Sequence, residues 1–217
     1  MGFPEGDAGM VTIEETEIVR AFCCIRLDNG TRWWIRREDL PLSGFQEGMS
    51  YDEEAFQQKV LLCQYPRALN HAVSMLARRP CSKKEIADRL KRLRYTEEVS
   101  DLVVYRLEKE NLLDDDAFCE QWIRYRLSTK HGRSVIRREL RIKGISSDMI
   151  DKAFEALDPD EEEENAVKLA AKAWKRTGTA GDRRKIRQKV IASLVRKGYG
   201  WEAARLACEK AETETEE

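Results

Sequence analysis

The stretch IRRELRIKGISSDM, residues 136–149, decides the architecture because it recurs twice more in the chain. Its gap-free equivalents are IADRLKRLRYTEEV at residues 86–99 and VIASLVRKGYGWEA at residues 190–203. Each copy has an apolar residue, a second one four positions later, a basic residue, a turn, and an apolar residue that opens the next helix. Self-similarity of this kind is typical of repeat proteins, so the sequence predicts three tandem helical units.

Helical periodicity divides each unit into three helices. Gly144 and Gly198 stand where a left-handed residue ends a helix, whereas Arg94 takes that place in the first copy and weakens the turn prediction there. Ser82 and Glu85 have the spacing of a capping box. The expected helices are 69–78, 82–93 and 96–110 in the first unit, 115–129, 133–143 and 146–157 in the second, and 161–175, 182–197 and 200–211 in the third.

The N-terminal segment has a different pattern. Glu17–Leu27 contains apolar and β-branched residues typical of a strand, Asp28-Asn29-Gly30 favours a turn, and Thr31–Arg36 is the returning strand. The adjacent Trp33 and Trp34 of that strand must point to opposite faces. A capping-box spacing of Ser50 and Glu53 predicts a helix over 51–65, separate from the one that begins at Leu69.

These patterns predict a mainly α protein of three tandem three-helix repeats, preceded by a small N-terminal β-hairpin or sheet segment with a helix. The expected domains are 1–66 for the extension, 67–113 and 114–158 for the first two repeats, and 159–217 for the third repeat with an acidic tail.

The net charge of −1 conceals an uneven distribution of charge. Residues 1–66 carry a net charge of −6, residues 67–158 carry +4 and residues 159–217 carry +1. Acidic residues of the last segment concentrate at its two ends, which leaves a strongly basic centre. The neutral total therefore does not exclude an anionic partner. A membrane-spanning protein is excluded by the lack of a run of about 18 uncharged apolar residues.

Motifs for catalysis and metal binding are missing from the sequence. There is no phosphate-binding loop, no H-E-x-x-H and no G-x-S-x-G. The six cysteines form no C-x-x-C pair, and isolated cysteines at apolar positions are mostly core residues in a reducing compartment. His71 and His131 lie in different repeats, and Asp114–Asp116 are better explained as helix caps than as Mg²⁺ ligands. With no secretory signal in MGFPEGDAGM, we expect a cytoplasmic protein that is not an enzyme and has no cofactor and no metal.

Basic residues gather on the second helix of each repeat. In the middle repeat, positions 134, 137, 138 and 141 share one helical face, and Glu139 is the only acid nearby. A charged face is usually only a solvated face, but this density of cations favours a binding surface. The predicted strip of the middle repeat consists of Lys130, Arg133, Arg137, Arg138, Arg141 and Lys143, with Arg124 and Arg126 from the preceding helix. The equivalent strips are Lys83, Lys84, Arg89, Lys91, Arg92 and Arg94 in the first repeat, and Arg183, Arg184, Lys185, Arg187, Lys189, Arg196 and Lys197 in the third.

Aromatic residues on the preceding helix have two interpretations. Phe118, Trp122 and Tyr125 share a helical stripe, which favours core packing. Trp122 and Tyr125 also alternate with arginines, and stacking on the bases of a single strand is the alternative.

Two segments of the middle repeat resemble the signature of the RecX family, regulators of the bacterial recombinase RecA. They are LLDDDAFCEQWIRYR at 112–126 and KHGRSVIRRELRIKGISSDMI at 130–150. The looser repeat extends the resemblance over 67–211, while the insertion-like 177–181, the acidic tail and the Trp-containing hairpin lie outside the signature. The positions that match are Leu113, Asp114, Asp115 and Phe118, then Lys130, Gly132, Ile136, Glu139, Leu140, Lys143, Gly144 and Ile145.

The resemblance implies an elongated, curved body of three repeats without enzymatic activity. It implies binding in the groove of the RecA–single-stranded-DNA filament and inhibition of RecA's ATPase, strand exchange and co-protease activities, which modulates DNA repair and the SOS response. The expected partners are thus the RecA filament and single-stranded DNA, touched weakly or indirectly, with no membrane partner and the chain as a monomer. A direct nucleic-acid-binding helical repeat protein and a helical scaffold unrelated to DNA remain the alternatives.

Overall fold

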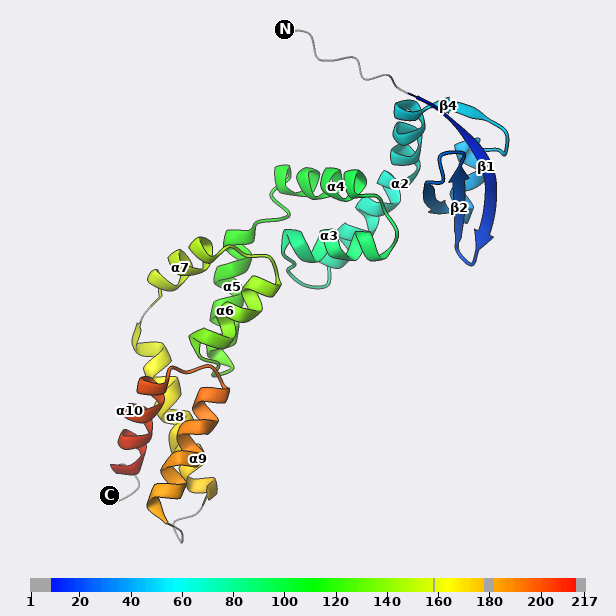
Figure 1. The fold of residues 1–217 in the computed structure, drawn as a ribbon. Coiled ribbons are helices and arrows are strands. Elements are labelled where there is room, and N and C mark those ends of the chain that lie inside the picture. The colour runs from blue at the N-terminus through cyan, green and yellow to red at the C-terminus, as the bar shows by residue number, and fades with distance from the viewer. Residues whose placement is uncertain (1–8, 158, 178–181, 214–217) are drawn as a thin grey trace. The chain divides into compact units, whose positions relative to one another are not determined.

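The computed structural model describes residues 9–157, 159–177 and 182–213 (Figure 1). The chain is mostly helical and begins with an antiparallel sheet. It divides between Leu113 and Asp114 into two compact units, which are described one at a time below. Within the described ranges, no helix has the length and apolar character needed to cross a membrane.

The sheet of the first unit has four strands in the order β3-β2-β1-β4. The predicted hairpin is confirmed, with a turn in which Gly30 has a φ of 82°. The single strand expected over Glu17–Leu27 is wrong, because the chain turns at Arg20, whose φ is 58°, and two strands meet there. The strands are β1 (Met10–Val19), β2 (Phe22–Leu27), β3 (Arg32–Arg36) and β4 (Ser50–Asp52).

The sequence prediction missed β1 because only its first half alternates. Val11 and Ile13 point into the core, but a bulge between Ile13 and Glu15 shifts the register, and acidic residues follow. The predicted helix cap at Ser50 is also wrong, since that residue pairs in β4. Asp52 is the cap, and its side chain accepts a hydrogen bond from the Ala55 amide at 3.1 Å.

A single helix, α2 (Glu53–Leu76), replaces the two helices expected on either side of Pro66. Pro66 lies on the exposed side of α2, where the carbonyl that loses its partner can bond to water instead. Phe56 and Val60 belong to the sheet core, whereas Ala68 and Ala72 belong to the core of the first repeat. The helix thereby joins the sheet and the first repeat into one unit (Figure 1).

The other predicted helices form in each repeat, with ends that differ by a few residues. The first repeat continues with α3 (Lys83–Arg92) and α4 (Glu97–Lys109). The second contains α5 (Asp115–Ser128), α6 (Arg133–Ile142) and α7 (Ser147–Glu155), and the third contains α8 (Pro159–Thr177), α9 (Arg183–Arg196) and α10 (Trp201–Thr213). All nine repeat positions expected to be apolar and buried are in the three cores: Ile86, Leu90, Tyr95, Ile136, Leu140, Ile145, Val190, Leu194 and Tyr199.

The expected caps form as well. Ser82 accepts from the Glu85 amide and Glu85 reaches back to the Ser82 amide, which completes the capping box of α3. The Asp114 carboxylate accepts from the amides of Asp116 and Ala117 at the start of α5. Asp114 is therefore the member of the acidic cluster that caps α5. No group of three or more metal-ligating side chains occurs among the described residues.

The turn after the second helix of each repeat is the same in all three copies. Gly144 and Gly198 have φ values of 88° and 97°, and Arg94 has a φ of 66°. This left-handed conformation destabilises a residue with a Cβ atom by about 1 kcal/mol or more. Contacts made by the Arg94 side chain must offset that cost.

The second and third repeats are joined at the N-terminus of α6, where no side chain of α6 itself acts as a cap. Instead, the Gly132 amide donates to the Lys197 carbonyl at 2.9 Å, and the Ser134 amide donates to the Gly198 carbonyl at 3.1 Å. A Cβ atom on Gly132 would lie 2.4 Å from backbone atoms of Gly198 and Tyr199. Glycine is required here because the two repeats approach each other through their backbones.

Candidate functional site

The basic side chains of the middle repeat extend from α6, whose opposite side is anchored in the core. Ile136 and Leu140 are fully buried and fix the rotation of the helix. Four cationic positions of α6, Arg133, Arg137, Arg138 and Arg141, therefore cannot enter the core.

Three of the predicted binding residues are used to hold helices together. Arg126 of α5 pairs with Glu139 of α6 at 2.6 Å. Arg133 pairs with Glu162 of α8 at 2.6 Å, and its guanidinium lies 5.2 Å from the centre of the Phe154 ring. Arg137 pairs with Asp151 of α7 and also lies over Phe154. Arg137 is thus turned toward α7, although the sequence pattern placed it on one face with Arg138 and Arg141.

Arg138 and Arg141 are exposed, and neither has a carboxylate partner within the described ranges. They lie three residues apart and so extend from the same side of α6. Lys130 also has no ion pair among the described residues, and it has a left-handed φ of 60° in the turn before α6. Of the remaining predicted residues, Arg124 pairs with Glu120, and Lys143 lies 4.1 Å from the centre of the Trp122 ring.

Glu139 is the polar link between α5 and α6. Its carboxylate accepts from the Trp122 indole N–H at 3.1 Å and from Arg126 at 2.6 Å. Only 25% of the Glu139 side chain and 18% of the Arg126 side chain are exposed, so water cannot fully replace either group. The sequence offered one signal for this role, because Glu139 is the only acid within a run of cations.

We expect Glu139→Ala to lower the free energy of unfolding by about 2 kcal/mol, because it leaves a half-buried guanidinium and an indole N–H unpaired. Chemical denaturation of the full chain measures this. Glu120→Ala is the matched control, because it removes a pair in which both side chains are more than half exposed, and it should change stability by less than about 0.5 kcal/mol. Equal stability of the two variants would contradict the role assigned to Glu139.

The first-repeat strip is largely neutralised by neighbouring acids. Lys83 pairs with Glu108 at 2.6 Å, Lys84 pairs with Asp88 and Lys91 pairs with Glu97 at 2.6 Å. Arg92 donates to a backbone carbonyl, that of Asp88. Arg89 is exposed and has no carboxylate partner in the described part of the chain. Arg94 leaves the strip altogether, because its guanidinium lies over the Trp34 ring of the sheet at 3.8 Å.

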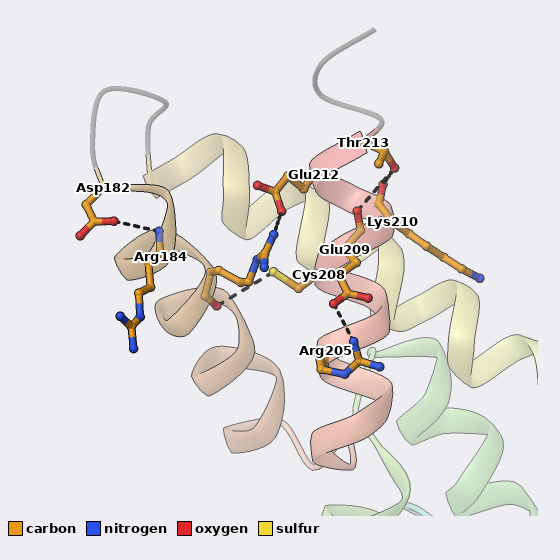
Figure 2. A network of polar contacts seen from close by, with 9 residues as sticks. Asp182, Arg184, Arg205, Cys208, Glu209, Lys210, Glu212 and Thr213 are labelled. Atoms are coloured by element: carbon orange, nitrogen blue, oxygen red, sulfur yellow. Dashed lines mark hydrogen bonds and ion pairs between the residues drawn. The ribbon is translucent and has the colours of Figure 1, made fainter.

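In the third repeat, α9 carries several exposed cations, of which Arg187 is paired with an acid of α10. Arg187 donates to Glu212 of α10 at 2.5 Å, and the Cys208 thiol donates to the Arg187 carbonyl at 4.0 Å. Figure 2 shows Glu212 and Cys208 together on α10. Asp182 caps α9 by accepting from the Arg184 amide at 3.0 Å, while the Arg184 guanidinium points away from the helix (Figure 2). Other exposed cations of this helix are Arg183, Lys185, Lys189 and Arg196.

The aromatic stripe of α5 is only partly buried. Phe118 is 5% exposed, and Trp122 packs against the core while its N–H is bonded to Glu139. Tyr125 is 56% exposed, so its assignment to the core stripe is wrong. The physical reason is that the buried face of α5 is centred on Cys119, Ile123 and Leu127, and at about 100° per residue Tyr125 points roughly 120° or more away from each of them.

The described residues give little indication of an active site. Burial raises the pKa of Cys119 and that of Cys208 to about 11, as expected for core thiols rather than nucleophiles. All six cysteines are free, and five of them are buried, which confirms their assignment to the cores. A groove of about 840 Å³ between α8 and α10 is lined by lysines and acidic residues together with Val167 and Ala171.

Comparison with known proteins agrees with the repeat architecture. Sequence models of the first, second and third three-helix domains of RecX match residues 68–107, 114–153 and 160–208. A regulatory protein RecX from Listeria innocua is 31% identical over 191 residues, which cover 88% of this chain and 71% of that protein. One from Streptomyces lividans is 36% identical over 129 residues, 58% of this chain, and the match covers 66% of that protein, slightly less than two thirds of its length.

Solved structures give the same result. A crystal structure of a regulatory protein RecX matches with a TM-score of 0.62 and 25% identity, over 92% of this chain and 99% of the other. RecX from Lactobacillus salivarius has the same fold, with a TM-score of 0.62 and 23% identity over 69% of this chain and 97% of the other. With three matching domains in order and a relative aligned along most of its length, this chain belongs to the RecX family of regulatory proteins.

Proposed function

We propose that this chain is a non-enzymatic regulator that binds the RecA filament on single-stranded DNA and inhibits RecA's ATPase, strand exchange and co-protease activities. Family membership supports the regulatory role. The observation that carries the binding assignment is the pair of exposed arginines on α6, Arg138 and Arg141, which no carboxylate in the described ranges neutralises.

The contact surface centres on the middle repeat and extends to the third repeat of the same unit. Lys130, Arg138 and Arg141 form its centre, and Arg184 of α9 is an exposed cation that extends it. Arg126, Arg133 and Arg137 contribute indirectly, because their ion pairs hold α6 against α5, α7 and α8. We place the domain limits at 67–113, 114–158 and 159–217 for the three repeats, after an N-terminal extension. The site of action is the cytoplasm.

The direct test is ATP hydrolysis by RecA on single-stranded DNA with increasing amounts of this protein. We expect the rate to fall as the chain approaches the concentration of filament, because occupancy of the filament by a tight ligand saturates near that point. Unchanged hydrolysis at a stoichiometric excess would contradict the proposal.

Direct binding of nucleic acid by the basic repeats is the second candidate. The exposed cations of α9 favour it, since a strongly cationic helix attracts any polyanion. Strongly salt-dependent binding to bare DNA together with no effect on RecA would select this candidate. Failure of both assays would select a helical scaffold whose partner is unrelated to DNA.

A further inference from the structure

The junction between the sheet and the first repeat carries arginines packed on aromatic rings. The Arg94 guanidinium lies 3.8 Å from the centre of the Trp34 ring and 5.7 Å from that of Phe22. The Arg36 guanidinium lies 4.6 Å from the same Phe22 ring. Two cations from different parts of the chain, strand β3 and the turn after α3, therefore share one aromatic platform.

Further cations converge on the same junction. Burial lowers the pKa of His71, and the positive charges of Arg36, Arg67 and Arg89 lower it further. The His71 ring lies 6.0 Å from the ring of Tyr95, which is 7% exposed. Burial raises the pKa of Tyr95, and the charge of Arg36 and its hydrogen bond to the Tyr95 hydroxyl oppose that rise. Arg36 is therefore anchored at this junction by Tyr95 as well as by Phe22.

The acids near this junction do not neutralise all of its cations. Arg67 is held by Asp39 at 2.9 Å and by Glu38 at 3.2 Å, which uses both carboxylates. Glu15 and Glu17 stand on β1, two strands away from β3. Arg36, Arg89 and Arg94 have no carboxylate partner among the described residues. Arg94 also takes a left-handed conformation that the other two repeats assign to glycine.

From this arrangement we infer a second interaction surface, formed by Arg36, Arg89 and Arg94 with Trp34 and Phe22, that binds single-stranded nucleic acid. The cations fit phosphate groups, and an arginine held against an aromatic ring offers its outer face to an unpaired base. A single strand fits better than a duplex, because in a duplex the base faces are covered. This surface goes beyond the proposed function, because it requires no recombinase.

The test is binding of a fluorescein-labelled oligothymidylate to the full chain without RecA, measured by fluorescence anisotropy over a range of salt concentrations. Arg94→Gly should weaken binding by roughly threefold to tenfold. This variant keeps the turn, because glycine is the residue that the other repeats use at this position. Adding Arg89→Gln should make the slope of log affinity against log salt shallower by about 0.7 for each lost phosphate contact.

Arg106→Gln is the matched control, because it removes the same charge from an exposed arginine more than two turns along α4, where Glu110 already pairs with it. It should leave affinity and salt slope unchanged. No binding by the wild-type chain, or equal binding by the Arg89→Gln/Arg94→Gly variant, would overturn the inference. Equal competition by an abasic strand of the same length would also overturn it, because the surface would then recognise only a polyanion. As the assay contains no RecA, its failure leaves the proposed inhibition untouched.

Discussion

Reversal of charge at both Arg138 and Arg141 is expected to raise the protein concentration that halves RecA's ATP hydrolysis by about 10- to 100-fold. The estimate follows from the roughly 1–3 kcal/mol lost when attraction between a cation and an acidic surface becomes repulsion. The two side chains are exposed and unpaired in the described ranges, so Arg138→Glu/Arg141→Glu should leave helix content and stability unchanged. Circular dichroism and thermal unfolding check that the variant is folded.

Lys152→Glu on α7 is the control for the change in net charge, since Lys152 is exposed in the same repeat but lies outside the predicted strip. It should inhibit RecA as the wild type does. Arg137 is left intact in this test because Arg137→Glu would face Asp151 with a like charge and weaken the packing of α6 on α7. Full inhibition by the Arg138→Glu/Arg141→Glu variant would remove α6 from the binding surface while leaving the regulatory role open.

Replacement of Gly132 by alanine is expected to lower the free energy of unfolding of the second unit by about 3 kcal/mol. The added Cβ atom would collide at 2.4 Å with backbone atoms, which cannot rotate away as a side chain can. Relief of the collision would separate the N-terminus of α6 from the Lys197 and Gly198 carbonyls and leave the Gly132 and Ser134 amides without acceptors.

Hydrogen exchange resolves this effect at the junction itself. In Gly132→Ala the Ser134 amide should lose most of its protection, while amides in the sheet of the first unit keep theirs. Gly200→Ala is the matched control, because a Cβ atom there meets nothing within 4 Å, and its effect should be about 0.5 kcal/mol or less. Wild-type protection of Ser134 in Gly132→Ala would show that the junction adapts to a side chain.

Prediction from sequence succeeded where local physics decides the outcome. The Ser82 and Glu85 pair forms its capping box, and the three turns take left-handed residues, because each depends on atoms within one turn of helix. It failed at Pro66 and at β1. Continuation of α2 through the proline depends on which side of the helix is solvated, and β1 is held by its pairing with strands β2 and β4.

For the binding surface too, the sequence determines some features and the tertiary structure determines others. The count of cations on α6 is visible in the sequence, but which of them are neutralised is not, because Arg133 and Arg137 find their acids 29 and 14 residues further on. The repeat, the helices after α2, the nine buried repeat positions and the family follow from the sequence alone, since periodicity and short-range spacing determine them. The tertiary structure decided that Gly132 is a contact between repeats, that Glu139 links two helices, and that Arg138 and Arg141 stay exposed. Each of these depends on residues brought together across the fold, which no local pattern records.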